Sequence, residues 1–94
     1  MNKDMILMHQ IMEEAHILMV GRNDKYGDSW KVLTLQSIAN LVEMKMHRIA
    51  RMNSQNLDPK ILDEFTDGLN YCAMGIAALR KLEHEQSQSD NSSI

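Results

Sequence analysis

Apolar residues recur every three or four positions along most of this chain, a spacing that marks one face of an α-helix. Residues 3–20 carry the first stripe, and Gly21 is placed to end the helix that the stripe predicts. Residues 21–30 then form the expected first connection. The stripe consists of Leu7, Met8, Ile11, Met12, Ala15, Leu18 and Met19.

A second stripe predicts a helix that begins near Thr34 or Ser37 and ends at about Met52. Polar, turn-forming residues fill positions 53–58, so we expect a break in the helical structure there. The apolar members of this stripe are Ile38, Leu41, Val42, Ile49 and Met52.

A third helix is predicted from Pro59 to about His84. Asp58 is suited to cap it, and proline is tolerated at a first helical position, where no N–H is needed. Polar residues dominate the end of the chain, so we expect one helical domain over residues 1–85 and a disordered tail over residues 86–94. The stripe of the third helix consists of Ile61, Phe65, Leu69, Cys72, Ile76 and Leu79.

These patterns predict an all-α fold of three helices, in which the second and third form a long antiparallel hairpin. With 94 residues the chain is one domain at most, and a domain of this size buries a modest share of its surface. Nine methionines, against four aromatic residues, give it a flexible core with few rigid side chains. We therefore expect a homo-oligomer, a dimer or higher, that associates through Met-rich helical faces.

Charge and composition exclude several classes of protein. The net charge of −3, from 13 acidic and 10 basic residues, argues against general binding to DNA or RNA. The single cysteine, Cys72, excludes an internal disulfide and a thiolate metal cluster. Charged residues interrupt the apolar runs near the N-terminus, and no run of about 18 apolar residues exists, so we expect neither a signal peptide nor a membrane span. These features favour a cytoplasmic protein.

Lys45 breaks the apolar stripe of the second helix, because at about 100° per residue it falls near the centre of that face. A buried ammonium must pair with a carboxylate or a ligand, or shift its pKa. The alternative is that the aliphatic stem packs while the charge reaches solvent at the edge of the bundle. Arg48 follows one turn later, where its guanidinium is suited to bind phosphate or carboxylate.

The third helix has the opposite exception, since Asp63, Asp67 and Asn70 share one face and Glu64 leans toward it. Carboxylates at this spacing can hold a hydrated magnesium ion, although acids near a helix start are also typical of a solvated face. The same face continues as apolar Met74, Ala77 and Ala78, so we expect it to be covered. Covered acids need partners, and Lys45 and Arg48 are the candidates.

Two other groups of residues carry weaker signals of chemistry. His9, Glu13 and His16 have a spacing that suits zinc, but a third strong ligand is missing and a surface role is favoured. Cys72 sits in an apolar stripe, where thiols are usually inert.

The segment KYGDSW, residues 25–30, holds two of the four aromatic residues. Gly27 permits a positive φ, and Asp28 or Ser29 can cap a following helical turn. Tyr26 and Trp30 flank that turn, where they can stack on a base or ribose that Asp28 hydrogen-bonds. As an alternative, both rings plug the open end of the helical bundle.

The order DKYGDSW (24–30), MKMHRIARM (44–52) and LDEFTDGLNYCAM (62–74) resembles the nucleotide modification associated domain 1 family. These are small helical proteins, largely from phages and bacteria, so the resemblance implies a bacterial or phage-infected cell. It covers roughly residues 8–82. The family pattern has an acid before the lysine, whereas this chain has Met44 there. The matching positions are Tyr26, Gly27, Asp28, Ser29, Trp30, Lys45, Arg48, Asp67, Asn70 and Tyr71.

A fainter resemblance is to MazG-like nucleotide pyrophosphohydrolases, whose acidic pattern is similar to Asp63, Glu64 and Asp67. It implies magnesium on these three carboxylates. The adjacent acids of the first helix, Glu13 and Glu14, do not reproduce the spacing of the second acidic pair of those enzymes.

Three functions remain open at this point. The first is a nucleotide-binding protein that captures a nucleotide or nucleotide signal, or serves nucleotide and base-modification metabolism. The alternatives are a Mg-dependent nucleoside triphosphate pyrophosphohydrolase and a helical oligomeric interaction module. Under the first two, we expect Lys45→Ala to abolish nucleotide binding while the helices still form. The predicted nucleotide-binding residues are Tyr26, Asp28, Trp30, Lys45, Arg48, Asp67, Asn70 and Tyr71.

Overall fold

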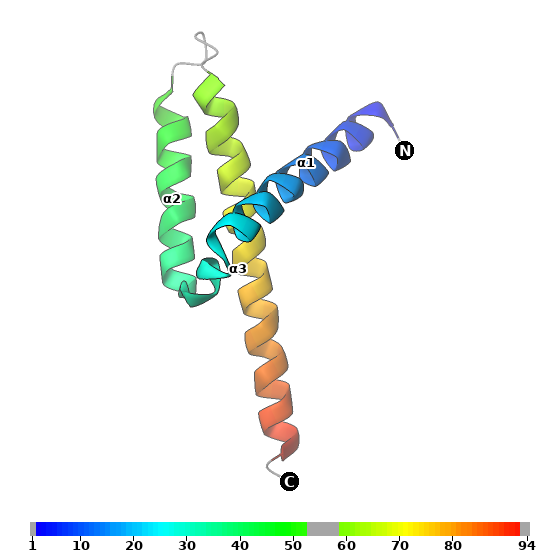
Figure 1. Ribbon diagram of the computed structural model, residues 1–94, viewed down its shortest axis with the longest axis vertical. Coiled ribbons are helices and arrows are strands. Elements are labelled where there is room, and N and C mark those ends of the chain that lie inside the picture. The colour runs from blue at the N-terminus through cyan, green and yellow to red at the C-terminus, as the bar shows by residue number, and fades with distance from the viewer. Residues whose placement is uncertain (1, 53–58, 93–94) are drawn as a thin grey trace.

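The computed structural model describes residues 2–52 and 59–92, and it confirms the all-α prediction with three long helices (Figure 1). A short 3₁₀ helix lies between the first two. In chain order the elements are α1 (Lys3–Tyr26), η1 (Ser29–Val32), α2 (Leu35–Arg51) and α3 (Pro59–Ser92).

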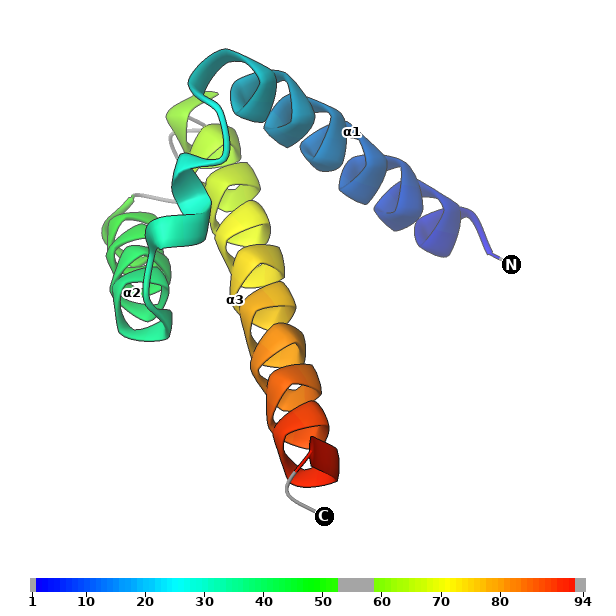
Figure 2. The same ribbon diagram turned by 60° about the horizontal axis from the view of Figure 1, so that its bottom comes forward.

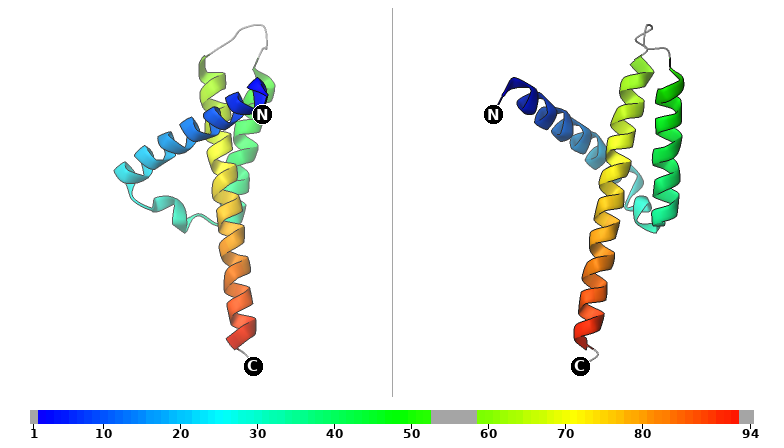
Figure 3. Two further views of the ribbon diagram at one scale, coloured as in Figure 1. Left: turned by 90° about the vertical axis from the view of Figure 1, so that its right-hand side faces the viewer. Right: turned by 180° about the vertical axis from the view of Figure 1, so that it is seen from behind.

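Helices α2 and α3 run antiparallel side by side and form the predicted hairpin (Figures 1 and 3). The predicted start of α2 is confirmed, because the Thr34 side chain caps the helix by accepting a hydrogen bond from the Ser37 backbone N–H. Pro59 is the first residue of α3, as expected. The predicted break at residues 53–58 and the predicted cap at Asp58 lie outside the described residues.

The predicted end of the first helix is wrong, because α1 continues through Gly21 to Tyr26. Glycine weakens a helix by about 1 kcal/mol relative to alanine, but it does not stop one. The helix ends instead at Gly27, whose φ of 70° and ψ of −163° belong to a backbone region that is essentially restricted to glycine. Residues 21–26 of the predicted connection are therefore helix rather than loop.

The predicted end of the third helix is also wrong, since α3 runs past His84 to Ser92. The described residues after Gly75 include neither glycine nor proline, so nothing in the backbone chemistry of this segment terminates the helix. The division into a domain over residues 1–85 and a tail over residues 86–94 stays a prediction.

The helices leave little apolar surface fully buried. Helix α1 crosses α3 near the middle of α3 (Figure 1), and its N-terminal part points away from the hairpin (Figure 2). In residues 2–52 and 59–88, Ala15 and Ile38 are the buried apolar side chains. None of the described helices is long and apolar enough to cross a membrane.

The covered face of α3 differs from the predicted stripe, of which Phe65 and Ile76 are more than half exposed. Helix α2 packs instead against Gly68 and Gly75, where a Cβ atom would lie 3.1 Å from Met46 Cε and 3.5 Å from Ile38 Cγ2, respectively. Glycines let two helices approach closely, so they set the packing face in place of the larger apolar residues. The prediction that the face with Met74, Ala77 and Ala78 is covered holds, because all three are half-buried.

Candidate functional site

The loop after α1 is held together by a chain of side-chain hydrogen bonds. Trp30 donates from Nε1 to Asn23 Oδ1 over 3.0 Å, and Asn23 donates from Nδ2 to Asp28 Oδ1 over 3.0 Å. The second oxygen of Asp28 pairs with Lys31 Nζ at 3.0 Å. The hydrogen bond from Asn23 and the charge of Lys31 together lower the pKa of Asp28. Asp28 thus fixes the loop, and its side chain does not cap η1.

The two aromatic rings of this loop have different surroundings. The ammonium of Lys81, from α3, lies 5.3 Å from the centre of the half-buried Trp30 ring. Tyr26 is 66% exposed and has Lys25 Nζ 5.4 Å from its ring centre. Both distances are within the range of cation–π attraction. Trp30 is therefore anchored, whereas the Tyr26 ring is open to solvent.

Tyr26 and Trp30 border a cavity of about 120 Å³ between the last turns of α1, the loop and the middle of α3. We call it the loop cavity. Helix α1 contributes its final turns because it continues to Tyr26, and Gly27 then turns the chain so that Trp30 faces α3. The lining residues are Met19, Arg22, Asn23, Tyr26, Gly27, Ser29, Trp30, Asp67, Asn70, Tyr71 and Met74.

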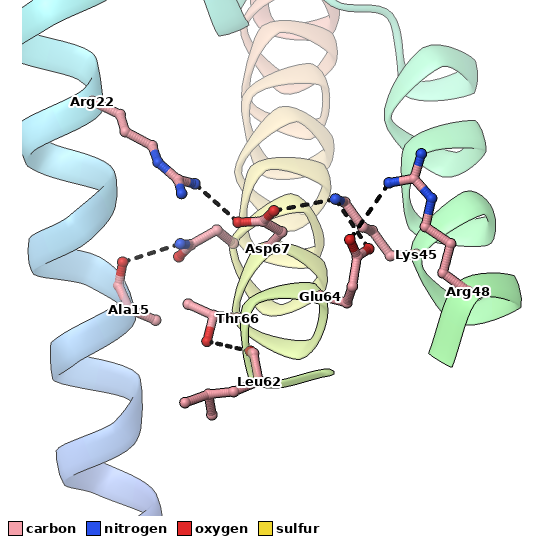
Figure 4. Close-up of polar contacts among 9 residues, drawn as sticks. Ala15, Arg22, Lys45, Arg48, Leu62, Glu64, Thr66 and Asp67 are labelled. Carbon is pink, nitrogen blue, oxygen red and sulfur yellow. Dashed lines mark hydrogen bonds and ion pairs between the residues drawn. The ribbon is translucent and has the colours of Figure 1, made fainter. Parts of the chain in front are cut away.

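A row of alternating charges joins the three helices beside this cavity, and we call it the charge chain (Figure 4). Arg22 of α1 donates from Nη1 to Asp67 Oδ1 of α3 over 2.9 Å. Lys45 of α2 lies between the two acids of α3, with Nζ 3.1 Å from both Asp67 Oδ2 and Glu64 Oε2. Arg48 Nη1 ends the chain 3.5 Å from Glu64 Oε1. Three cations and two carboxylates give it a net positive charge.

The charge chain has clear electrostatic consequences. Burial by itself lowers the pKa of Lys45, but Glu64 and Asp67 outweigh it and hold that pKa above its usual value. Burial by itself raises the pKa of Asp67, but Arg22 and Lys45 hold it below its usual value. Glu64 Oε2 makes its contact with Lys45 as an ion pair, 3.1 Å from Nζ. Lys45 and Asp67 are therefore both charged at neutral pH.

Asn70 ties α1 to α3 directly. Its Nδ2 donates to the backbone carbonyl of Ala15 over 3.0 Å, and both residues are buried at the crossing. Because Asn70 also lines the loop cavity, this hydrogen bond fixes one wall of the cavity.

The structure brings most of the predicted nucleotide-binding residues to one place. Five of the eight line the loop cavity, namely Tyr26, Trp30, Asp67, Asn70 and Tyr71. The other three lie behind or beside it: Asp28 holds the loop, Lys45 is buried between two acids, and Arg48 is at the far end of the charge chain. Lys45 and Asp67 are neighbours as expected, since the predicted ion pairs between the two hairpin helices are present.

Sequence reasoning missed Arg22 and Asn23, both of which line the cavity. The cause was the interpretation of Gly21 as a helix end, which placed both residues in a loop. A signal was present, because Asn23 and Tyr26 continue the spacing of three and four that runs through Ala15 and Met19.

The fold does not bring the ligands of the predicted metal sites together in the described residues. Within the part of the chain that the structure describes, no group of three His, Cys, Asp or Glu side chains is placed to hold a metal ion. Asp63 is exposed, while Glu64 and Asp67 point at the cations of the charge chain. In α1, His9 pairs with Glu13 at 2.9 Å, and both side chains are exposed. Glu64 and Asp67 would have to leave the cations of the charge chain before they could bind magnesium.

A family model described as nucleotide modification associated domain 1 matches residues 22–79, a span that contains the whole charge chain and most of the loop cavity. No curated protein and no solved structure matches this chain.

Proposed function

Because the chain belongs to the nucleotide modification associated domain 1 family, we propose that it binds a nucleotide with one ring of the ligand in the loop cavity. The observation that carries this proposal is the convergence of five predicted positions on one cavity, from α1, the loop and α3. The family name supports a nucleotide-related role, and the side chains around the cavity suit a ring with polar edges.

The size of the cavity limits which part of a nucleotide it holds. A cavity of about 150 Å³ accommodates benzene, whereas sites that enclose a drug-sized ligand span about 300–1,000 Å³. The loop cavity, at about 120 Å³, matches a single ring. A base ring or a ribose fits inside, among the aromatic side chains of Tyr26, Trp30 and Tyr71, and the phosphates then lie outside.

Arg22 is the residue best placed to meet those phosphates. It lines the cavity and its side chain is half exposed, while only one of its nitrogens is engaged by Asp67. A guanidinium has five N–H donors, so several remain for phosphate oxygens. Lys45, in contrast, is buried and paired with two carboxylates. We therefore assign phosphate binding to Arg22 in place of Lys45.

The first experiment is isothermal titration of the full chain with nucleoside mono- and triphosphates and cyclic dinucleotides, with and without magnesium. The sole tryptophan, Trp30, gives a second readout by fluorescence. Each binding ligand is recovered and analysed by chromatography. Binding of an intact ligand supports the proposal. Release of monophosphate and pyrophosphate would instead make the protein a pyrophosphohydrolase, and absence of binding by the whole panel would overturn the proposal.

A matched pair of variants then tests the site. Tyr26→Ala removes an exposed ring that borders the cavity, and we expect binding to weaken by about tenfold or more because base–aromatic stacking contributes about 1–3 kcal/mol. Val32→Ala removes an exposed side chain from the same loop that does not line the cavity, so it serves as the control. Equal affinities of the two variants would place the ligand elsewhere.

A second pair tests the phosphate contact. Arg22→Gln should weaken binding of a triphosphate more than binding of its nucleoside, since the lost contacts are to phosphate. Arg51→Gln changes an exposed arginine of α2 that does not line the cavity. An equal loss for nucleoside and triphosphate would contradict the assignment of Arg22.

A further inference from the structure

Helix α3 carries an exposed row of apolar residues, which we call the seam. Its members follow one another at spacings of three, four, three, four and three, the pattern by which one helix packs along another. The exposed fraction of its large apolar members runs from 36% for Leu69 to 71% for Leu62. The seam consists of Leu62, Phe65, Leu69, Cys72, Ile76 and Leu79.

An apolar groove of about 500 Å³ adjoins the seam on the hairpin. Helix α2 forms one wall with Leu35, Ala39 and Val42, and the seam residues Cys72, Ile76 and Leu79 form the other. Helix α1 contacts α3 at Asn70, which points well away from the seam at about 100° per residue. Neither α1 nor α2 therefore covers the seam.

The accessible surface area of the chain is large enough to include an interface with a partner. The accessible surface is 7767 Å², whereas a compact monomer of 10.8 kDa exposes about 5,500 Å². The excess is about 2,200 Å², part of which lies at the projecting ends of α1 and α3. A stable dimer interface needs about 800 Å² from each partner, so the excess is ample for one.

We propose that a second copy of this chain covers the seam and the adjoining groove, so that two hairpins pack face to face as a four-helix bundle. A second copy is the occupant that the seam itself favours, because a row with this regular spacing is complementary to another copy of itself across a two-fold axis. Pairing also supplies the apolar core that a single chain, with Ala15 and Ile38 buried, does not build. This proposal is independent of nucleotide binding.

Analytical ultracentrifugation of the full chain at micromolar concentration tests it. Ile76→Glu places two carboxylates in the proposed interface, so we expect dimerisation to weaken on the order of 100-fold. Ile17→Glu is the matched control, because Ile17 is 69% exposed on α1, against 53% for Ile76 in the seam. Met12→Glu probes the exposed Met-rich face of α1. A monomeric wild type, or a dimer that only Met12→Glu dissociates, would overturn the proposal.

Cross-linking at Cys72 keeps the test independent of how well the variants fold. Cys72 is an exposed thiol next to the middle of the seam, so pairing about the middle brings the two thiols close whichever way the helices run. A short bis-maleimide should therefore join two wild-type chains at micromolar concentration, and denaturation in urea should prevent it. A wild type that sediments as a dimer but does not cross-link would place the interface on another face.

Discussion

The loop cavity and the charge chain share Arg22 and Asp67, yet they are built in opposite ways. In the charge chain each buried charge faces an opposite charge at about 3 Å, and Lys45 is closed off from solvent. In the loop cavity the Trp30 ring is held by its hydrogen bond to Asn23, and the lining side chains border open space. The charge chain is complete in itself, whereas the loop cavity has room for a ligand.

This difference separates two roles that residue type alone does not distinguish. A lysine, an arginine and several acids near an aromatic loop have the composition of a phosphate site and of a structural ion-pair network alike. Burial and pairing decide between them here. Lys45 joins helices α2 and α3, while Arg22 connects the network to the cavity.

The strongest test of the comparison is Lys45→Met, which keeps the aliphatic stem and removes the charge. Glu64 and Asp67 would then lie partly buried with fewer partners, so we expect the free energy of unfolding to fall by about 3 kcal/mol. Urea denaturation followed by circular dichroism measures it. Lys31→Met is the control, since its solvent-exposed pair with Asp28 should contribute far less to stability than the buried pairs of Lys45.

This expectation revises the one drawn from the sequence, in which removal of the Lys45 charge abolishes binding and leaves the helices intact. If Lys45→Met unfolded like the wild type but no longer bound nucleotide, Lys45 would be a ligand contact and the structural role would be wrong.

The pH dependence of stability tests whether the charge of Asp67 stabilises the fold. Arg22 and Lys45 depress the pKa of Asp67 in the folded state below its ordinary value of 3.8. The stabilisation from Asp67 is therefore present at pH values above 3.8 and is lost as the pH falls through the lower, folded-state pKa. Denaturation curves for wild type and Asp67→Asn should differ at pH 7 and converge toward pH 2. A difference that is constant with pH would show that the charge of Asp67 does not stabilise the fold.

The two glycines at the end of α1 provide the next test, of what shapes the cavity. Gly27→Ala forces a side chain into a glycine-only backbone region, so we expect a loss of about 1–3 kcal/mol. Gly21→Ala meets no atom within 4 Å and should stabilise the helix by about 0.5–1 kcal/mol. Thermal unfolding of both variants measures the contrast. A destabilised Gly21→Ala variant would contradict a helix that continues to Tyr26.

These glycines also show how far the sequence predicts the fold. The spacing of apolar residues predicted three helices and the hairpin, because that spacing is a property of each segment alone. It could not tell Gly21 from Gly27, since which glycine takes a positive φ depends on how the chain must turn to reach α3. The covered face of α3 was missed for a related reason, because Gly68 and Gly75 determine it through close approach rather than through hydrophobicity.

The candidate site was predictable to a similar degree. Lys45 could be placed among carboxylates because an ammonium on an apolar face needs a partner. The roles of Asp28 and Arg22 could not be predicted, since they depend on the helix that continues to Tyr26 and on the side of the loop that each residue faces.

The smallest expected effect concerns Asn23, whose amide links Trp30 to Asp28 at the rim of the cavity. Asn23→Ala removes both of these hydrogen bonds but gains helix propensity. Asn40→Ala on α2 is the control, because it gains the same helix propensity and loses one exposed hydrogen bond with Gln36. The two variants should therefore differ in the free energy of unfolding by about 1 kcal/mol, the value of the loop hydrogen bonds. Trp30 fluorescence should change in Asn23→Ala alone, because its indole N–H loses its acceptor. Unchanged emission in both variants would mean that Asn23 does not hold the ring in solution, and the wall that Trp30 gives the loop cavity would then be free to move.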